Sequence, residues 1–508
     1  MSITGLMRRR AYSLSSSTRE PERPLDSRVA LLLVAILVLA FVLRVGAAVA
    51  FPNMEVSDET FATREAAHRL AYGYGLINPD WREGLRSWVF PAFLAGVMRV
   101  TDWMGAGSSG YLLGIMIVLS LISLTTVWFS FMWAYRTSGI VAAIIAAGTS
   151  AIWYELVYYG PKAFYEVVGA HVLLPGLYLG AFGESIPERK RLFLSGLLCG
   201  LALALRPPLA PAVVFAAIAF SLKNPRVRLP AIAAGILAPV VVFGIVDAFT
   251  WSYPFHSFIS FFRVNVVNGA QTTGVQVSRQ WIVESGWYRP WYWFLPVLAK
   301  RLGPLVLIAL IGVRRSPFLG WVALLILLTH SIVGHKEFRF IYPIIPIAVT
   351  LAGLGIAEML SALKARSHLL RSVATTCVVG LIPCVCISAA LAWFFPLWSR
   401  YSGSLIAFQN LSRDANVCGV ALVGPEVDPT IGGGYTYLHR NVPIFFFPTA
   451  AAADTKQLSP SFNALVTALP LRHAGFESTR CWNGTCLQRS QVSCTPNPGN
   501  AVKFLPVE

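Results

Sequence analysis

Charged residues are scarce in this chain, and their scarcity excludes an ordinary soluble globular protein. Only 13% of the 508 residues are Asp, Glu, Lys or Arg, whereas 56% are hydrophobic. Soluble proteins carry about 25% charged residues. The composition therefore indicates a polytopic membrane protein.

Acidic residues are the scarcer of the two signs of charge. The chain has 41 Lys and Arg against 24 Asp and Glu, which gives a formal charge of +17. A strongly basic chain can bind nucleic acid, but here the basic residues fall in short clusters between apolar runs. That distribution is typical of the cytoplasmic loops of membrane proteins. No nucleic-acid partner is predicted.

Motifs for nucleotides and metals are also missing. The sequence contains neither a Walker A motif nor a G-x-G-x-x-G stretch after a predicted strand, and Gly432-Gly433-Gly434 is a lone glycine run typical of a turn or loop. No set of His, Cys and carboxylate residues has the spacing of a metal site. Neither a metal nor a cofactor is predicted.

The eight cysteines divide into two groups of four by their surroundings. One group lies in apolar spans and is predicted to pack as small core residues. The other lies in the polar C-terminal part, where an extracytoplasmic location would allow two disulfides of open connectivity. The first group is Cys199, Cys377, Cys384 and Cys386, and the second is Cys418, Cys481, Cys486 and Cys494.

Hydropathy divides the chain into three parts. Residues 1–28 are polar and basic, and they predict a disordered cytoplasmic tail. Residues 29–396 hold the apolar runs and predict about 11–13 transmembrane helices, with a first outer loop at 52–87. Residues 397–508 are mostly polar and predict a small extracytoplasmic α/β domain. The predicted fold class is thus mainly α, a polytopic membrane bundle with this domain at its C-terminus.

Two segments within the membrane part have unusual patterns. Residues 60–72 predict a short amphipathic helix at the membrane interface. The long apolar run at 192–220 is interrupted by Arg206-Pro207-Pro208, which predicts two short helices meeting at a break that lines a protein cavity. Strict alternation of the loops then requires about thirteen crossings, with 160–183 folded as two short ones.

The densest charge cluster stands between two apolar runs. His335-Lys336-Glu337-Phe338-Arg339 places four ionisable side chains in five residues. Such a cluster at the end of a membrane span is costly unless it has partners, water or a charged ligand. Snorkelling to the interface explains a lone Lys or Arg better than a Glu and a His in the same turn. We therefore interpret the cluster as functional, with snorkelling as the alternative.

The predicted topology places this cluster on the same side of the membrane as Asp58-Glu59. A carboxylate that faces cations suits a transfer reaction with a phosphate leaving group. The carboxylate takes a proton from the attacking hydroxyl, and the cations offset the charge of the departing phosphate. An outer compartment lacks cytoplasmic nucleotides, so a lipid-phosphate donor is favoured. By itself, the acidic pair could also be a solvated loop feature.

Several stretches resemble one enzyme family. His335–Pro343 is similar to the signature of the lipid-phosphate-mannose-dependent mannosyltransferases, in particular the GPI mannosyltransferase III branch. Tyr72-Gly73-Tyr74-Gly75 and Gly84-Leu85-Arg86-Ser87-Trp88 resemble the first outer loop of this family, and Gly433–Pro443 resembles a C-terminal motif of it. Residues 161–166 depart from the Asn-Thr-x-Glu-like stretch expected there.

This resemblance implies a GT-C architecture and an inverting mannosyl transfer. The implied donor is polyprenyl- or dolichyl-phosphate-mannose, and the implied acceptor is a glycolipid or a lipid-linked glycan. Asp58 is implied as the general base, with Glu59 positioning the acceptor or acting as the base instead. The other implied site residues contact the donor phosphate or the substrate. They are His335, Lys336, Glu337, Arg339, Arg86 and His68, with Glu337 expected to orient Arg339.

Two alternatives stay open. One is a GT-C transferase with another lipid-phosphate sugar, such as arabinose, and the other is a lipid-linked sugar flippase or transporter. Transporters often contain inverted repeats, and none is apparent here. The Ala- and Arg-rich composition is typical of a bacterial protein and predicts a bacterial inner membrane with the site facing the periplasm. In a eukaryote, the corresponding location would be the endoplasmic reticulum membrane with a luminal site.

Overall fold

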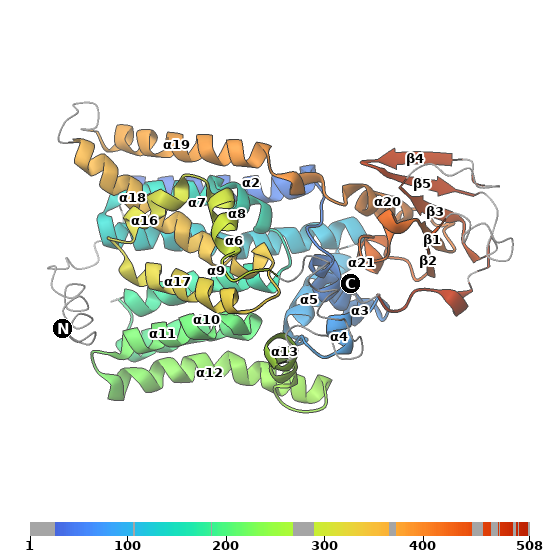
Figure 1. Ribbon diagram of the computed structural model, residues 1–508, viewed down its shortest axis with the longest axis horizontal. Coiled ribbons are helices and arrows are strands. Elements are labelled where there is room, and N and C mark those ends of the chain that lie inside the picture. Colours follow the sequence, from blue (N-terminus) through green and yellow to red (C-terminus); the bar gives the residue numbers. More distant parts are fainter. Residues whose placement is uncertain are drawn as a thin grey trace.

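Helices make up most of the described chain, and they form a long bundle with a smaller group of elements at one end (Figure 1). This computed structural model describes residues 26–104, 107–183, 185–267, 289–364, 372–449, 461–468, 476, 478–490, 494–495 and 497–505. Residues 1–25 of the predicted cytoplasmic tail lie outside the described residues.

The bundle consists of apolar helices that run between its two ends (Figure 1). If the bent pair α15–α16 is taken as one, the described residues contain eleven such helices, which is the lower end of the predicted 11–13. They are α2 (Ser27–Ala50), α6 (Gly107–Ser138), α7 (Ile140–Ile152), α9 (Tyr165–Ala181), α10 (Glu188–Leu205), α11 (Ala210–Ser221), α12 (Pro225–Thr250), α15 (Phe294–Leu302), α16 (Leu305–Gly312), α17 (Pro317–Ile332), α18 (Ile344–Lys364) and α19 (Val373–Trp393).

Length separates these helices into two kinds. Five described helices are long and apolar enough to cross a membrane singly, and the pair α15–α16, bent by 100°, would make a sixth. Among the shorter ones, α7 is buried from Ala142 to Ala151. Because protein surrounds that helix, its length does not have to match the thickness of a lipid bilayer.

The chain reverses direction at Arg206-Pro207-Pro208, where a helix cannot continue. A Cβ on Gly169, near the start of α9, would contact Arg206 and Leu209, and one on Gly180, near its end, would contact Phe220. Therefore α11 runs beside α9 and antiparallel to α10. Two helices were predicted here. Because they are antiparallel, they make two crossings, and successive loops then alternate between the two ends of the bundle. The predicted pair of crossings at 160–183 is wrong, because α9 is one helix.

Protein encloses most of the segment 60–72. A π-helical turn (η1, Thr60–Arg64) leads into α3 (Glu65–Tyr72), which ends at Gly73 with φ 87°. Phe61 is fully buried, while Leu70 remains half exposed. The structure thus contains the predicted short helix, and its location at the membrane interface stays a prediction.

The C-terminal part contains a five-stranded sheet at the end of the bundle that holds α3 (Figure 1). The strand order is β2-β1-β3-β5-β4, with β1 parallel to β2 and β3, and with β5 antiparallel to β3 and β4. The predicted strands at 417–423 and 442–447 correspond to β1 and β2. The strands are β1 (Val420–Val423), β2 (Ile444–Phe447), β3 (Ala464–Thr467), β4 (Ser478–Trp482) and β5 (Thr485–Arg489).

Short helices connect the bundle to this sheet and line the space between them (Figure 1). The domain boundaries given above stay a prediction. The short elements are α4 (Pro79–Arg82), α5 (Val89–Trp103), α8 (Tyr154–Tyr159), η2 (Pro207–Leu209), α13 (His256–Phe262), η3 (Arg263–Val267), η4 (Phe338–Ile341), η6 (Pro396–Ser399), α20 (Ser402–Ser412), η7 (Pro425–Val427), α21 (Gly434–Leu438) and η9 (Pro498–Asn500).

A buried carboxylate joins α3 to α21. Glu65 accepts hydrogen bonds from the backbone amides of Leu76 (2.9 Å), Tyr435 (3.0 Å) and Thr436 (2.8 Å), and from the Thr436 hydroxyl (2.6 Å). Gly434 has φ 59°, and a Cβ there would lie 2.7 Å from the Glu65 carboxylate. The glycine therefore allows α21 to approach the first outer loop closely. Through this contact, the C-terminal segment fixes the position of that loop.

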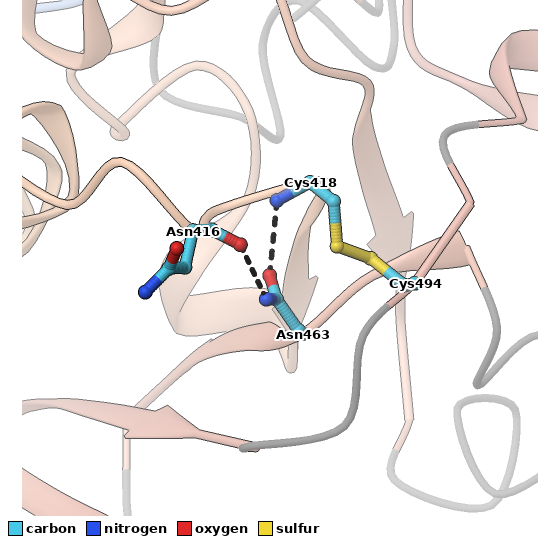
Figure 2. Close-up of a disulfide and its surroundings, with 4 residues drawn as sticks. All are labelled: Asn416, Cys418, Asn463 and Cys494. Carbon is cyan, nitrogen blue, oxygen red and sulfur yellow. Dashed lines mark hydrogen bonds between the residues drawn. A yellow bond between two sulfur atoms is a disulfide. The ribbon is translucent and has the colours of Figure 1, made fainter.

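Two disulfides form among the four outer cysteines, as the sequence allowed. They join Cys418 to Cys494, across 76 positions, and Cys481 to Cys486, across five. Beside the first one, the backbone amide of Cys418 donates to the Asn463 side chain at 3.1 Å (Figure 2). Of the membrane cysteines, Cys199, Cys377 and Cys384 are buried as predicted, whereas Cys386 is exposed.

The two disulfides are expected to differ in their effect on stability. By chain entropy, a closed loop of this longer span contributes about 4 kcal/mol and the short one about 2 kcal/mol. Replacing Cys418 and Cys494 by Ser should therefore lower the Tm of the purified protein more than replacing Cys481 and Cys486. An equal or reversed order of the two Tm values would contradict this ranking.

Removing the charge of Glu65 should loosen the docking of α21. In Glu65→Gln, only one oxygen remains to accept hydrogen bonds, so buried amides lose their partner at a cost of about 2 kcal/mol. We expect a lower Tm and faster proteolysis in detergent. Glu426→Gln, which changes an exposed carboxylate in the same part of the chain, is the matched control and should change neither. Equal Tm values for the two variants would show that Glu65 does not hold this contact.

Candidate active site

The first outer loop and the cluster at 335–339 meet through one arginine. Arg339 Nη2 donates to Asp58 Oδ2 at 2.6 Å, and its Nε donates to Glu337 Oε2 at 2.7 Å. The predicted placement of the two loops on one side is thus confirmed by direct contact. Arg339 is only 5% exposed. A buried arginine paired with two carboxylates does not snorkel, so that alternative is wrong.

Glu337 holds the arginine in place from the same turn. Its second oxygen accepts from Arg339 Nη2 at 3.1 Å and lies 3.2 Å from His335 Nε2. Burial opposes the charge on this side chain, but Arg339 and His335 outweigh it and hold the pKa of Glu337 far below its usual value. The neighbouring Lys336 is also buried, and its ammonium donates to the Val333 carbonyl. The contacts of Glu337 fit the orienting role expected for it.

Asp58 keeps part of its carboxylate accessible. Its side chain is 25% exposed, and the only contacts found for it among the described residues are those of Oδ2 with Arg339. The other oxygen, Oδ1, therefore remains able to accept a proton or a hydrogen bond. This side chain is the accessible carboxylate of the Asp58-Glu59 pair.

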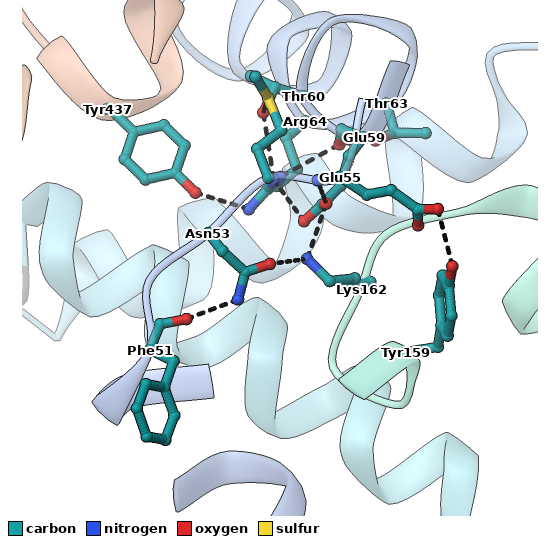
Figure 3. Close-up of polar contacts among 11 residues, drawn as sticks. Phe51, Asn53, Glu55, Glu59, Thr60, Thr63, Arg64, Tyr159, Lys162 and Tyr437 are labelled. Carbon is teal, nitrogen blue, oxygen red and sulfur yellow. Dashed lines mark hydrogen bonds and ion pairs between the residues drawn. The ribbon is translucent and has the colours of Figure 1, made fainter. Parts of the chain in front are cut away.

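Glu59 is enclosed by cations (Figure 3). It accepts from Arg64 Nη2 at 2.9 Å, from Lys162 Nζ at 2.8 Å and from the amide of Glu55 at 3.1 Å. Burial opposes its charge, but Lys162 and Arg64 hold the pKa of this carboxyl below its usual value. These contacts favour the anionic form of Glu59 and commit its carboxylate to holding the loop together.

The polar contacts of His68 are with Tyr74 and His439, and not with the Arg339 cluster. Its Nε2 is 3.1 Å from Nδ1 of His439, and its Nδ1 is 3.0 Å from the Tyr74 carbonyl. Burial lowers the pKa of His68 to about 4, so the ring is neutral near pH 7. The ring also packs against Tyr72 and Tyr74. The structure thus places His68 in the packing between α3 and the C-terminal segment.

Arg86 borders a cavity with one polar and one apolar side. The guanidinium bonds Asp80 at 2.9 Å and lies over the Tyr165 ring. The hydroxyls of Ser87 and Tyr165 line the same cavity, and both are buried without a hydrogen-bond partner among the described residues. Unpartnered buried donors of this kind suit a ligand that supplies oxygen atoms. The opposite walls are apolar and include Leu205, Phe243, Phe258 and Phe261.

Three buried charged residues of this region were not selected from the sequence. Glu166 pairs with Arg206 at 3.2 Å, and the Arg206 guanidinium lies 4.5 Å from the Phe340 ring centroid. Lys162 is the third, through its contact with Glu59. Arg206 and Glu166 are charged residues within apolar runs, and this position in the sequence could have identified them as candidates. Their pairing could not be inferred, because it depends on the reversal after α10.

Comparisons with known proteins agree with this geometry. A model of the Alg9-like mannosyltransferase family matches residues 35–415. GPI mannosyltransferase 3 of Yarrowia lipolytica is 24% identical over 421 residues, which are 81% of this chain and 76% of the relative. GPI alpha-1,2-mannosyltransferase 3 of Danio rerio is 24% identical over 333 residues, 61% of this chain and 57% of the relative, so the chain spans less than two thirds of that protein.

Two solved structures have a similar fold. ArnT from Cupriavidus metallidurans, bound to undecaprenyl phosphate, aligns with a TM-score of 0.59 at 14% identity and covers 93% of this chain and 100% of its own. The Archaeoglobus fulgidus oligosaccharyltransferase aligns with a TM-score of 0.53 at 12% identity and covers 86% of this chain and 69% of its own. At such identities the likeness concerns the fold, which is GT-C. Since the family model spans well over half of the sequence, the chain belongs to the Alg9-like mannosyltransferase family and is a membrane mannosyltransferase.

Proposed function

We propose that this enzyme moves a mannosyl residue from a polyprenyl-phosphate-mannose donor to a hydroxyl of a glycolipid or lipid-linked glycan. The observation that carries the proposal is the contact between Asp58 and Arg339, which brings an accessible carboxylate to a buried guanidinium. A hydroxyl that displaces a sugar from phosphate needs a general base for the attacking oxygen and a cation for the leaving phosphate, and this contact brings two such groups into one site.

The reaction is a single in-line displacement. The acceptor oxygen attacks the anomeric carbon while Asp58 Oδ1 takes its proton. The new bond joins the acceptor oxygen to the anomeric carbon, and the bond from that carbon to the phosphate oxygen breaks. The electron pair leaves with the polyprenyl phosphate, so the anomeric configuration is inverted. Glu59 is a poorer base because its carboxylate is already bonded to Lys162 and Arg64.

Arg339 is the central contact for the donor phosphate. Its planar guanidinium can bind two phosphate oxygens, and Glu337 holds it in orientation. His335 and Lys336 flank it and add positive charge or hydrogen bonds. An arriving phosphate would compete with Asp58 for Arg339 and so release the carboxylate for its role as base.

The cavity beside Arg86 suits the lipid end of the donor. Its polar side offers Arg86, Ser87 and Tyr165 to oxygen atoms, while its aromatic walls suit an isoprenoid chain. ArnT, which has a similar fold, was solved with undecaprenyl phosphate bound. The relatives named above are GPI mannosyltransferases, which supports a glycolipid as the acceptor class.

The site faces the outer side of the membrane, which is the periplasm in a bacterium and the lumen of the endoplasmic reticulum in a eukaryote. Basic residues gather at the opposite end of the helices, in the first turns of α10 and α12 and after α16, as the positive-inside rule requires of cytoplasmic segments. The two disulfides in the C-terminal part fit an oxidising compartment.

Label transfer tests this proposal. Purified protein receives radiolabelled polyprenyl-phosphate-mannose and a membrane lipid extract. Asp58→Asn should lower kcat by about 10²–10⁴, the range for loss of a general base, with little change in the KM for the donor. Glu426→Gln is the matched control and should behave as wild type.

Three results would contradict the proposal. If Asp58→Asn transferred label at the wild-type rate, Asp58 would not be the base. If Glu59→Gln lost activity at an unchanged Tm while Asp58→Asn kept it, the roles of the two carboxylates would be reversed. If the wild type used no lipid-phosphate mannose but did use another lipid-phosphate sugar, the donor assignment would be wrong.

A further inference from the structure

A second pocket borders the acidic pair on the side of Glu59. One wall is polar and the other aromatic. The polar wall includes Asn53, Glu59, Lys162, Tyr437 and Gln409, and the aromatic wall consists of Phe51, Tyr158 and Trp398. This combination differs from the cavity beside Arg86, in which the walls opposite the polar groups are formed by aliphatic and phenylalanine side chains.

The polar wall is built from fixed hydrogen-bonding groups (Figure 3). Lys162 Nζ donates to Asn53 Oδ1 and to Glu59 Oε2, each at 2.8 Å. The same ammonium lies 4.5 Å from the centroid of the Tyr158 ring, which belongs to the aromatic wall. Arg64 Nη1 donates to the Tyr437 hydroxyl at 3.0 Å, and this hydrogen bond fixes the orientation of the hydroxyl. Such donors and acceptors match the hydroxyls of a sugar.

The aromatic wall is equally fixed. Trp398 Nε1 donates to the Ala392 carbonyl at 2.9 Å, and its ring packs against Tyr158 and Phe51 at centroid distances of 5.3 and 5.8 Å. Phe51 follows the last residue of α2 and is 51% exposed. Aromatic residues at the end of a membrane helix lie at the level of lipid headgroups. The pocket therefore opens where the sugar of a membrane glycolipid would lie.

One short segment separates this pocket from the proposed donor site. Lys162 lines the pocket, the Phe164 ring lies 5.3 Å from the Arg339 guanidinium, and Tyr165 lines the cavity beside Arg86. Asp58 and Glu59 are consecutive, with Asp58 bonded toward Arg339 and Glu59 facing the pocket. The acidic pair thus connects this pocket, through Glu59, to the Arg339 cluster, through Asp58.

We propose that the pocket formed by Lys162, Asn53, Tyr437 and Trp398 binds the sugar headgroup of the acceptor glycolipid and presents its hydroxyl to Asp58. This inference rests on the proposed function, because it assigns the second substrate of the same reaction. The donor is less suited to this pocket, since both of its main cations are already paired with Glu59. Its aromatic surfaces instead suit the apolar faces of sugar rings.

The test separates the two substrates in the label-transfer assay. Trp398→Ala removes one of the three rings of the aromatic wall. At saturating donor, we expect the lipid-extract concentration for half-maximal transfer to rise about tenfold, which corresponds to about 1.4 kcal/mol. The maximal rate at high extract and the KM for the donor should stay close to wild type. Trp393→Ala is the matched control, because it changes the last residue of α19, an 85% exposed tryptophan that does not line the pocket.

A second variant guards against a folding defect. Gln409→Ala truncates a partly exposed lining residue and should shift the half-maximal extract concentration in the same direction with an unchanged Tm. If both variants left that concentration unchanged, or if they raised the KM for the donor instead, the acceptor assignment would be overturned. A wild type that transfers no label under any condition would overturn the proposed function and, with it, this inference.

Discussion

The end of the bundle that carries the candidate site depends on the buried guanidinium of Arg339. It bridges Asp58 in the first outer loop and Glu337 in its own turn, and so it joins segments that are far apart in the sequence. A buried arginine without carboxylate partners would cost several kcal/mol. The need to pair it therefore brings the two loops together, and the same need places an accessible carboxylate beside a cation suited to phosphate.

The other buried charges near the site are also paired, and their contacts fix its geometry. Glu59 pairs with Arg64 and Lys162, and Glu166 pairs with Arg206. Glu65 joins the loop to α21 through three hydrogen bonds from Tyr435 and Thr436. Most of these carboxylates are thus committed to structure, and the exposed oxygen of Asp58 stands apart from them. The contacts that each carboxylate makes therefore decide whether it has a structural role or remains available to a substrate.

The sequence predicted the parts of the site that are visible as local anomalies. The charge cluster at 335–339, the acidic pair at Asp58 and the proline break after Arg206 were each identified, because each violates the apolar pattern around it. Long-range geometry was harder to infer. The reversal that makes α10 and α11 antiparallel, the contact of His68 with His439 and the enclosure of Glu59 by Lys162 all depend on how distant segments pack. The burial of most of the predicted helix at 60–72 depends on this packing as well.

The central claim is that Arg339 binds the donor phosphate and thereby frees Asp58. A structure of the protein with undecaprenyl phosphate bound would test it most directly. The account predicts phosphate oxygens within hydrogen-bond distance of the Arg339 guanidinium, and an Asp58–Arg339 separation longer than the present 2.6 Å. A phosphate bound elsewhere, with the Asp58–Arg339 ion pair intact, would contradict it.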